Sequence, residues 1–194
     1  MDLGLRGQTA VVAGGARGIG RAIAAEFAAE GANVTLIDRD ASAADAAREL
    51  AGRFRVRSTA FVTDVSDYEA VRRNAAETVS AFGRVDHVVF AVAVASGKYG
   101  FPFWSLEPGD WGRVLEVNVV GAVNVAQAFV PELVRARAGT ILLLASVAGQ
   151  VGSQTDPPYS ASKAALINFG QCAAKDLAPY GVRVNVICPG MVRT

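Results

Sequence analysis

The sequence predicts an α/β protein built on one doubly wound parallel sheet, with helices on both faces. Short apolar segments alternate with alanine-rich helical stretches along the chain, which is the pattern of consecutive βαβ units. The chain has 194 residues, 52% of them hydrophobic, so it can bury one substantial core. Because no linker separates two such patterns, we expect a single domain over residues 1–194.

The alternation predicts each element in turn. Strands are expected near residues 9–14, 33–38, 57–62, 86–92, 140–146 and 182–187, and helices near 19–30, 41–52, 67–82, 110–136 and 158–178. In a sheet of this kind ligands bind beyond the carboxyl ends of the strands. The residues expected at that edge are Gly14, Asp38, Asp64, Ser146 and Pro189.

A glycine-rich turn follows the first strand at residues 14–20 and leads into a helical stretch. Gly14, Gly18 and Gly20 allow a sharp turn, a close approach of the backbone to a pyrophosphate, and a helix N-terminus aimed at its charge. The second strand ends in Asp38, eighteen residues after Gly20, where a carboxylate accepts hydrogen bonds from an adenosine ribose. Strand, turn, helix, strand and acid in this order predict a dinucleotide-binding site.

A second group of residues predicts proton transfer. Tyr159 and Lys163 are one helical turn apart, and Ser146 ends an apolar run thirteen residues before Tyr159. A neighbouring ammonium favours the ionised phenol, so such a pair can act as acid and base near neutral pH. A serine hydroxyl can meanwhile polarise a carbonyl. The competing interpretation is a helix-surface pair without function, which the nearby dinucleotide fingerprint disfavours.

Composition excludes several other classes. A net charge of only +1 gives no excess for binding nucleic acid or an anionic membrane. No apolar stretch is expected to reach the roughly 18 to 20 residues needed to span a bilayer, and the N-terminus lacks a signal-peptide pattern, so a cytoplasmic location is expected. A single histidine, His87, disfavours a metal site or a serine hydrolase. The two cysteines, Cys172 and Cys188, are expected to be reduced packing residues.

Over essentially its full length, the sequence resembles the short-chain dehydrogenase/reductase family. Six motifs in order carry the resemblance: Gly14-x-x-x-Gly18-x-Gly20, Asp64-Val65, Asn118, Ser146, Tyr159-x-x-x-Lys163, and Pro189-Gly190 before Thr194. The resemblance implies a Rossmann-type fold. It also implies transfer of a hydride between a nicotinamide cofactor and a secondary alcohol or carbonyl compound.

The resemblance assigns a role to each catalytic residue. Tyr159 would be the acid/base, taking the alcohol proton during oxidation and returning it during reduction. Lys163 would favour the phenolate and hold the nicotinamide ribose. Ser146 would hydrogen-bond the substrate oxygen, and Asn118 would hold a water that relays protons to solvent.

For the cofactor, the resemblance favours NAD over NADP. Asp38 would bond the ribose hydroxyls of NAD and repel the extra phosphate of NADP. NADP stays possible because Arg17 and Arg39 are placed to grip a 2′-phosphate. The remaining implied contacts are Ile19 in the glycine turn, Asp64 and Val65 beside the adenine, and Pro189, Gly190 and Thr194 toward the nicotinamide.

The sequence departs from the family pattern in three places. The family's Asn-Asn-Ala-Gly is replaced by residues 90–93, Phe-Ala-Val-Ala, and the threonine before the first glycine by Ala13. We interpret these two changes as one compensated replacement of polar by apolar groups. The sequence stops at Thr194, where family members continue through a substrate lid and a last strand. We therefore expect a fragment that lacks the C-terminal lid and last strand, or a chain whose remainder is absent here.

On the substrate side, an aromatic segment at residues 97–106 follows the fourth strand, and residues 151–158 precede Tyr159. We expect the two segments to line an apolar pocket. An equally good interpretation of the aromatic rings is that they pack the loop onto the next helix. We therefore expect a small, apolar alcohol or ketone as substrate. The alternatives are an NADPH-dependent 3-oxoacyl thioester reductase and, in a different class, a nucleotide-binding scaffold with little turnover.

The expected helices near 110–136 and 158–178 carry apolar positions that we predict to face outward: Val114, Val125, Phe129, Ala164, Phe169 and Ala173. In the family the equivalent helices build a subunit interface. The resemblance therefore implies a homotetramer or homodimer.

Overall fold

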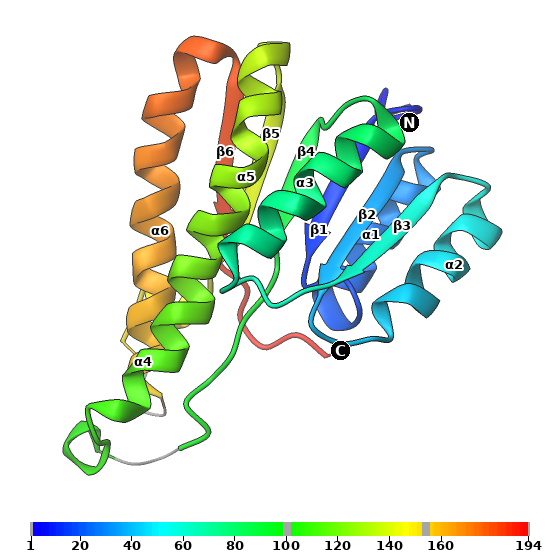
Figure 1. Ribbon diagram of the computed structural model, residues 1–194. Coiled ribbons are helices and arrows are strands. Elements are labelled where there is room, and N and C mark those ends of the chain that lie inside the picture. The colour runs from blue at the N-terminus through cyan, green and yellow to red at the C-terminus, as the bar shows by residue number, and fades with distance from the viewer. Residues whose placement is uncertain (1, 99–101, 153–155, 194) are drawn as a thin grey trace.

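Six parallel strands form one sheet in the order β3-β2-β1-β4-β5-β6 (Figure 1). The computed structural model describes residues 2–98, 102–152 and 156–193. The strands are β1 (Thr9–Ala13), β2 (Asn33–Asp38), β3 (Ser58–Val62), β4 (His87–Phe90), β5 (Gly139–Leu144) and β6 (Val182–Ile187). Strand order reverses beside β1, and the carboxyl ends of β1 and β4 therefore border the crevice where such sheets bind ligands. The predicted doubly wound sheet is confirmed.

Helices connect the strands and cover both faces of the sheet. They are α1 (Gly18–Ala29), α2 (Ala43–Phe54), α3 (Tyr68–Phe82), α4 (Gly109–Leu115), α5 (Gly121–Ala136) and α6 (Pro157–Leu177). Shorter helical segments are η1 (Phe103–Ser105), η2 (Glu116–Val120), η3 (Val147–Gly149) and η4 (Ala178–Tyr180). Local signals set both ends of α3: Asp67 caps its N-terminus by accepting from the Ala70 amide, and Gly83 ends it in the left-handed conformation.

The alternation of side chains along each strand creates two apolar layers. Val11 and Ala13 of β1 pack into a cluster with residues of α3, α5 and α6. Val12, between them, packs instead with residues of α1 and α2. Because the strands are buried on both faces, they carry continuous apolar runs, as the sequence predicted.

The helix predicted over residues 110–136 is not uniform. Between α4 and α5 the segment η2 is π-helical, with a wider turn that local periodicity does not reveal. The prediction of outward positions is wrong for Val114, Val125 and Phe129, which are buried in the core. Val125 and Phe129 of α5 pack with residues of β1, β4 and β5, whereas Val114 lies on α4, which packs against α6. Of the α6 positions, Ala164 is exposed and Phe169 and Ala173 are half-buried.

Among the described residues, one helical stretch, 109–136, is long and apolar enough to cross a membrane, with a mean hydropathy of 1.4. Core helices of soluble proteins pass the same test. In this stretch 44% of the most apolar window is buried inside the protein, where Phe129 and Leu133 are fully enclosed. The stretch contributes these residues to the core, but by length and composition the expectation that no stretch could span a membrane is wrong for it.

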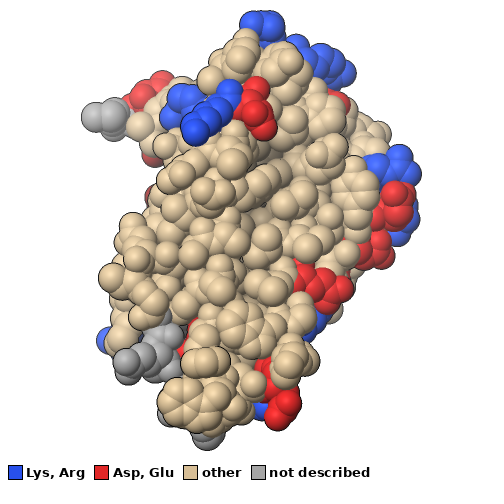
Figure 2. All heavy atoms as spheres, turned by 90° about the vertical axis from the view of Figure 1, so that its left-hand side faces the viewer, with Lys and Arg blue, Asp and Glu red and all other residues tan. Residues whose placement is uncertain are grey.

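The side of the molecule on which α6 lies presents a broad uncharged surface, with Lys, Arg, Asp and Glu gathered at its margins (Figure 2). Within α6, which the structure describes completely, the only exposed charged residues are Lys175 and Asp176 in the last turns. Cys172 is also exposed here, so its predicted packing role is wrong. Cys188, after β6, is half-buried.

Candidate active site

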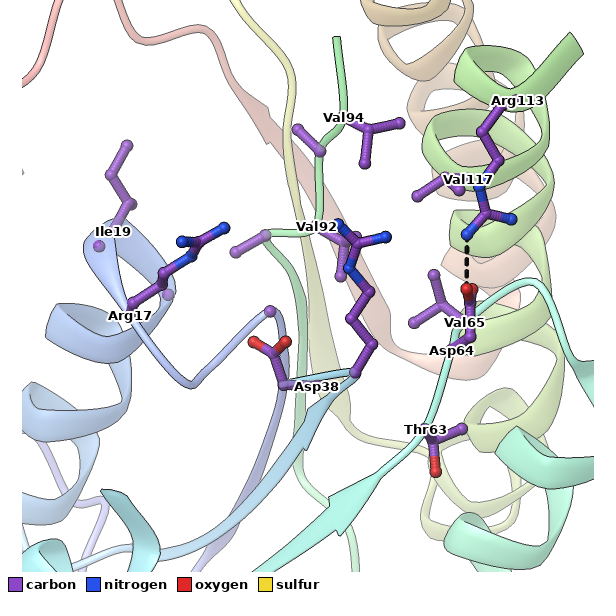
Figure 3. A pocket seen from close by; sticks show the side chains of 16 residues that line it. Arg17, Ile19, Asp38, Thr63, Asp64, Val65, Val92, Val94, Arg113 and Val117 are labelled. Atoms are coloured by element: carbon purple, nitrogen blue, oxygen red, sulfur yellow. Dashed lines mark hydrogen bonds and ion pairs between the residues drawn. The ribbon is translucent and has the colours of Figure 1, made fainter. Parts of the chain in front are cut away.

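A cavity of about 270 Å³ opens at the carboxyl ends of the first four strands (Figure 3). It is lined by Gly14, Arg17, Gly18, Ile19, Gly20, Asp38, Arg39, Thr63, Asp64, Val65, Ala91, Val92, Ala93, Val94, Arg113 and Val117. Nine of the residues predicted to bind a cofactor are among them, from Gly14 to Val65. The structure thus gathers segments from β1, β2 and β3 around one hollow.

The glycine turn depends on two contacts that exclude a side chain. A Cβ at Gly14 would lie 2.8 Å from the backbone carbon of Ala91, and the residue has a φ of +83°. A Cβ at Gly20 would lie 2.1 Å from the Gly14 carbonyl oxygen. Both positions therefore require glycine, because the turn packs directly on the chain leaving β4 and on the first turn of α1.

The N-terminus of α1 faces the cavity and suits an anion. Gly18, Ile19 and Gly20, all lining the cavity, form its first turn. Arg17, at the N-cap position, makes no side-chain capping hydrogen bond. The first backbone N–H groups of a helix have no intrahelical acceptor and carry partial positive charge. A pyrophosphate fits this place.

Asp38 is fixed by the backbone around it. One carboxylate oxygen accepts from the Ala16 amide at 3.0 Å and the other from the Asp40 amide at 3.0 Å. Each oxygen keeps a second lone pair for a further donor. Asp38 is therefore held at the rim of the cavity with accepting capacity to spare.

The two arginines that could grip an extra phosphate lie close to another acid, Asp40. A backbone hydrogen bond from Ser42 is the main cause of the lowered pKa of Asp40, and the charges of Arg17 and Arg39 contribute to it. An anion bound beside Asp38 would therefore lie near the carboxylates of Asp38 and Asp40 and near the guanidinium groups of Arg17 and Arg39.

Arg113 of α4 reaches Asp64 across the cavity wall, with Nη2 and Oδ2 2.5 Å apart (Figure 3). Partial burial by itself raises the pKa of Asp64, but hydrogen bonds from Ser66 and Arg113 outweigh it and lower the pKa to about 2. Arg113 was not predicted from the sequence. It meets a partner 49 residues away, and no local motif announces that contact.

The two apolar replacements seen in the sequence are neighbours in space. Ala13 of β1 pairs directly with Phe90 of β4 in the sheet register, and both are buried. The backbone still joins the strands beyond this pair, since Ala91 N donates to the Ala13 carbonyl at 2.8 Å. This geometry fits the interpretation that the replacements at Ala13 and Phe90 are one joint change. Both side chains are buried and apolar, so neither needs a hydrogen-bond partner inside the protein.

The predicted catalytic residues meet at the end of β5. Lys163 of α6 donates from Nζ to the Leu144 carbonyl at 2.7 Å, two residues before Ser146. Its Nζ also lies 5.5 Å from the ring centroid of Tyr159. Gly149 of η3 packs on the Lys163 backbone so closely that a Cβ there would come within 2.6 Å of it. Ser146, Tyr159 and Lys163 are therefore held around one junction of β5, η3 and α6.

The side chain of Lys163 is buried, with only 2% of its surface exposed. Burial disfavours the ammonium form and lowers the pKa of Lys163 to about 8. Near neutral pH the side chain is still mostly protonated, and it sits in a medium that strengthens its effect on a neighbouring phenol.

Asn118 joins the cavity to the catalytic helix. Its Oδ1 accepts from the Val94 amide at 2.8 Å, and its Nδ2 donates to the Val94 carbonyl and to Ser162 Oγ, both at 2.9 Å. Ser162 Oγ in turn donates to the Tyr159 carbonyl at 2.7 Å. Protein acceptors take both amide hydrogens, so the Asn118 side chain has no N–H left to donate to the predicted water.

The remaining predicted residues lie beside this junction. The Pro189 carbonyl accepts from the Val147 amide at 3.0 Å, which places Pro189 and Gly190 next to Ser146. Thr194 lies outside the described residues. None of Asn118, Ser146, Tyr159, Lys163, Pro189 and Gly190 lines the 270 Å³ cavity, so the structure shows two adjoining groups connected through Asn118 and Val94.

The aromatic segment is only partly packed. Phe103 and Trp104 are 65% and 76% exposed and meet edge to face, whereas Leu106 is buried. These two rings line a hollow together with Trp111 of α4, but packing onto that helix does not bury them. Residues 99–101, and residues 153–155 of the other predicted wall, lie outside the described part of the chain.

Comparison with known proteins gives a consistent picture. The sequence matches the family described as short chain dehydrogenase over residues 8–194. It is 38% identical over 201 residues to a (3R)-3-hydroxyacyl-CoA dehydrogenase of Mus musculus, covering 100% of this chain and 77% of that protein.

Solved structures share the architecture closely. L-sorbose reductase from Gluconobacter frateurii, complexed with NADPH and L-sorbose, superposes with a TM-score of 0.92 at 32% identity, covering 98% of this chain and 72% of that one. NAD⁺-bound xylitol dehydrogenase has a TM-score of 0.90 at 33% identity, covering 96% and 71%.

The lowered pKa of Lys163 predicts a pH-dependent stability. The folded protein releases this proton near pH 8, whereas the ordinary value is 10.5, so between these values the unfolded chain binds more protons. The free energy of unfolding should therefore rise with pH in this window. Relative to Lys163→Met, the wild type should gain about 2 kcal/mol from pH 8 to pH 10.

Urea denaturation at a series of pH values measures this difference. Lys175→Met, an exposed lysine of the same helix, is the control and should leave the profile unchanged. Parallel profiles for wild type and Lys163→Met would contradict the assignment.

Proposed function

The chain belongs to the short-chain dehydrogenase/reductase family and is an NAD(P)-dependent oxidoreductase; on this basis we propose that it transfers a hydride between NAD and a secondary alcohol or ketone. One observation carries the proposal. The cavity lined by the glycine turn and Asp38 is joined, through Val94 and Asn118, to the helix that bears Tyr159 and Lys163.

The residues present fit the cofactor. The uncapped N-terminus of α1 and the glycine turn would hold the pyrophosphate, Asp38 the adenosine ribose, and Asp64 and Val65 the adenine. Pro189, Gly190 and Thr194 would contact the nicotinamide end. When bound, the cofactor supplies the hydride donor or acceptor, and the chain supplies position and proton transfer.

Tyr159 would exchange a proton with the substrate oxygen. In oxidation the phenolate takes the alcohol proton as hydride leaves the same carbon, and in reduction the phenol gives it back. Lys163, whose Nζ lies 5.5 Å from the Tyr159 ring centroid, favours the phenolate. Ser146 would donate a hydrogen bond to the substrate oxygen and stabilise its developing charge.

Asn118 would serve the exit of that proton. Both Nδ2 hydrogens are committed to Val94 and Ser162, and we assign the relay water to the backbone carbonyl. The π-helical turn around Asn118 supports this choice, because such turns disturb the regular ladder of backbone hydrogen bonds and recur at functional sites.

NAD is the proposed cofactor because Asp38 lines the ribose side of the cavity, with Asp40 two residues further along the chain. A 2′-phosphate would meet Asp38 directly and Asp40 beside it, while Arg17 and Arg39 lie near enough to Asp40 to act on its charge. Repulsion from both acids would oppose the attraction of the arginines. NADP remains the alternative, since the comparison structures include one bound to NAD⁺ and one bound to NADPH.

We propose an apolar substrate on account of Phe103 and Trp104, which lie between β4 and α4 and expose large rings. An acyl thioester is the second candidate, favoured by the 38% identity to a (3R)-3-hydroxyacyl-CoA dehydrogenase. A nucleotide-binding scaffold with little turnover is the candidate from another class, motivated by the apolar replacements at Ala13 and Phe90.

We also propose a homodimer or homotetramer that buries the uncharged face over α6 (Figure 2). The exposed residues of that helix before Lys175 carry no charge, and Leu115, Val120 and Val123 of the neighbouring helical stretch are also exposed. Depletion of charge at the centre of a surface is typical of subunit interfaces.

Substituting Tyr159→Phe tests the catalytic proposal. The change removes the only proposed proton donor while keeping the ring, so kcat should fall by at least about a hundredfold and the Kd for NADH should stay within about twofold. Nicotinamide absorbance with a panel of secondary alcohols and ketones measures turnover. Tyr180→Phe, a partly exposed ring remote in sequence, is the matched control. Equal turnover in wild type and Tyr159→Phe would overturn the role of Tyr159, and the absence of turnover in both would favour the scaffold.

Fluorescence titration with NADH and then NADPH tests the cofactor proposal. The wild type should bind NADH more tightly. Asp38→Ser removes the charge that bonds the ribose and repels the phosphate, so the preference should shift toward NADPH by about tenfold or more. Asp45→Ser, an exposed acid of α2 paired with Arg48, should change neither Kd. Preference of the wild type for NADPH would overturn the proposal.

A charge placed on the α6 face tests the assembly. Ala164→Arg should convert the oligomer to smaller species in sedimentation velocity, because the new guanidinium group would be desolvated in the interface. Ala76→Arg, the same change at an exposed site on α3, should leave the sedimentation coefficient unaltered. A monomeric wild type at micromolar concentration would contradict the proposal.

A further inference from the structure

Asp156 is a buried carboxylate to which the proposed chemistry assigns no role. It is 4% exposed and stands at the N-cap of α6, three residues before Tyr159. Its Oδ1 accepts from the Tyr159 amide at 3.2 Å, and its Oδ2 accepts from the Ser96 amide at 2.9 Å. One carboxylate therefore bonds two segments that are 60 residues apart in the chain.

The segment on the other side of Asp156 is the chain that leaves β4. Val94, at its start, lines the cofactor cavity. Ser96 Oγ accepts from the Lys98 amide at 3.2 Å, and Lys98 Nζ pairs with Asp110 of α4 at 2.6 Å. The segment 94–98 thus runs from the cavity to the N-terminus of α6, and Lys98 ties its far end to α4.

The same segment is fastened to α6 a second time. Asn118 bonds both backbone groups of Val94 and also Ser162 of α6, and Ser162 bonds the Tyr159 carbonyl. The amide of Tyr159 is held by Asp156 and its carbonyl by Ser162. Both backbone groups of this residue are therefore connected to the segment 94–98.

We propose that Asp156 is a positioning residue that locks the segment 94–98 to the first turn of α6 and so sets the place of Tyr159 relative to the cofactor cavity. The inference rests on the proposed function, since it takes Tyr159 as the acid/base. It assigns to Asp156 a role distinct from ordinary capping, which needs only the bond to the Tyr159 amide.

The chemistry of the side chain fits two tasks. An ionised carboxylate is an acceptor at both oxygens, so it can serve the Tyr159 and Ser96 amides together. Serine can cap a helix but offers one short hydroxyl, which reaches a single amide. Asp156→Ser therefore keeps the cap and breaks the lock, which separates the two roles.

The direct test is amide hydrogen exchange at Ser96 together with kinetics. In Asp156→Ser, exchange at Ser96 should become about tenfold faster or more, because its acceptor is lost. In the same variant kcat should fall by about tenfold, since small displacements of a catalytic group are costly, while the Kd for NADH should stay within about twofold. Measurements are made well below the unfolding temperature of each variant.

Asp67→Ser is the matched control. Asp67 caps α3 by the same contact, a bond from the Ala70 amide at 2.9 Å, but it is exposed and joins no second segment in the described part of the chain. It should leave both kcat and Ser96 exchange unchanged. If the loss of a capping carboxylate alone lowered kcat, the decrease would be the same in Asp67→Ser and Asp156→Ser.

The outcomes separate the two proposals. Unchanged Ser96 exchange in Asp156→Ser overturns the lock, and so does faster exchange with unaltered kcat in an active enzyme. If the wild type and Tyr159→Phe are both inactive, the proposed function fails and the positioning role fails with it, while the exchange rates still decide whether Asp156 holds the segment.

Discussion

The contact between the glycine turn and the chain leaving β4 is the constraint on which the rest of the site depends. Gly14 lies so close to Ala91 that a Cβ would come within 2.8 Å of the backbone. This approach forms one side of the crevice where strand order reverses. It also aims the N-terminus of α1 into the cavity and leads the chain after β4 toward Asn118 and Asp156. A side chain at this point would separate the cofactor residues from the catalytic helix.

The strands on either side of that contact are joined without the polar groups that the family pattern leads one to expect. Ala13 and Phe90 face each other in adjacent strands and are both buried. An apolar pair avoids the cost of enclosing polar groups whose partners are absent. The strands remain connected through the bond from Ala91 N to the Ala13 carbonyl. Between β1 and β4, apolar packing of Ala13 and Phe90 therefore stands where the family pattern has polar side chains, and the glycine turn still contacts Ala91.

The catalytic end is organised by buried polar groups, each of which has a defined partner. Lys163 bonds the end of β5, Asn118 bonds Val94 and Ser162, and Asp156 bonds Ser96 and Tyr159. Burying a polar group costs free energy unless the group is hydrogen-bonded. A fully hydrogen-bonded set of buried polar groups favours one arrangement of the surrounding segments over alternative arrangements. Around Tyr159 these bonds hold the backbone that carries the phenol, whereas the cofactor cavity is formed at the ends of other strands.

The sequence by itself determined the order of elements, the glycine turn, Asp38 and the spacing of Tyr159 and Lys163. These features are local, because period, turn chemistry and one-turn spacing are set by neighbouring residues. Only the tertiary structure decided which faces of α4 and α5 are buried, and that the turn around Asn118 is π-helical. It alone also joined Arg113 to Asp64 and Asp156 to Ser96, across 49 and 60 residues. Such partners are chosen by the packing of whole elements, which no short stretch of sequence encodes.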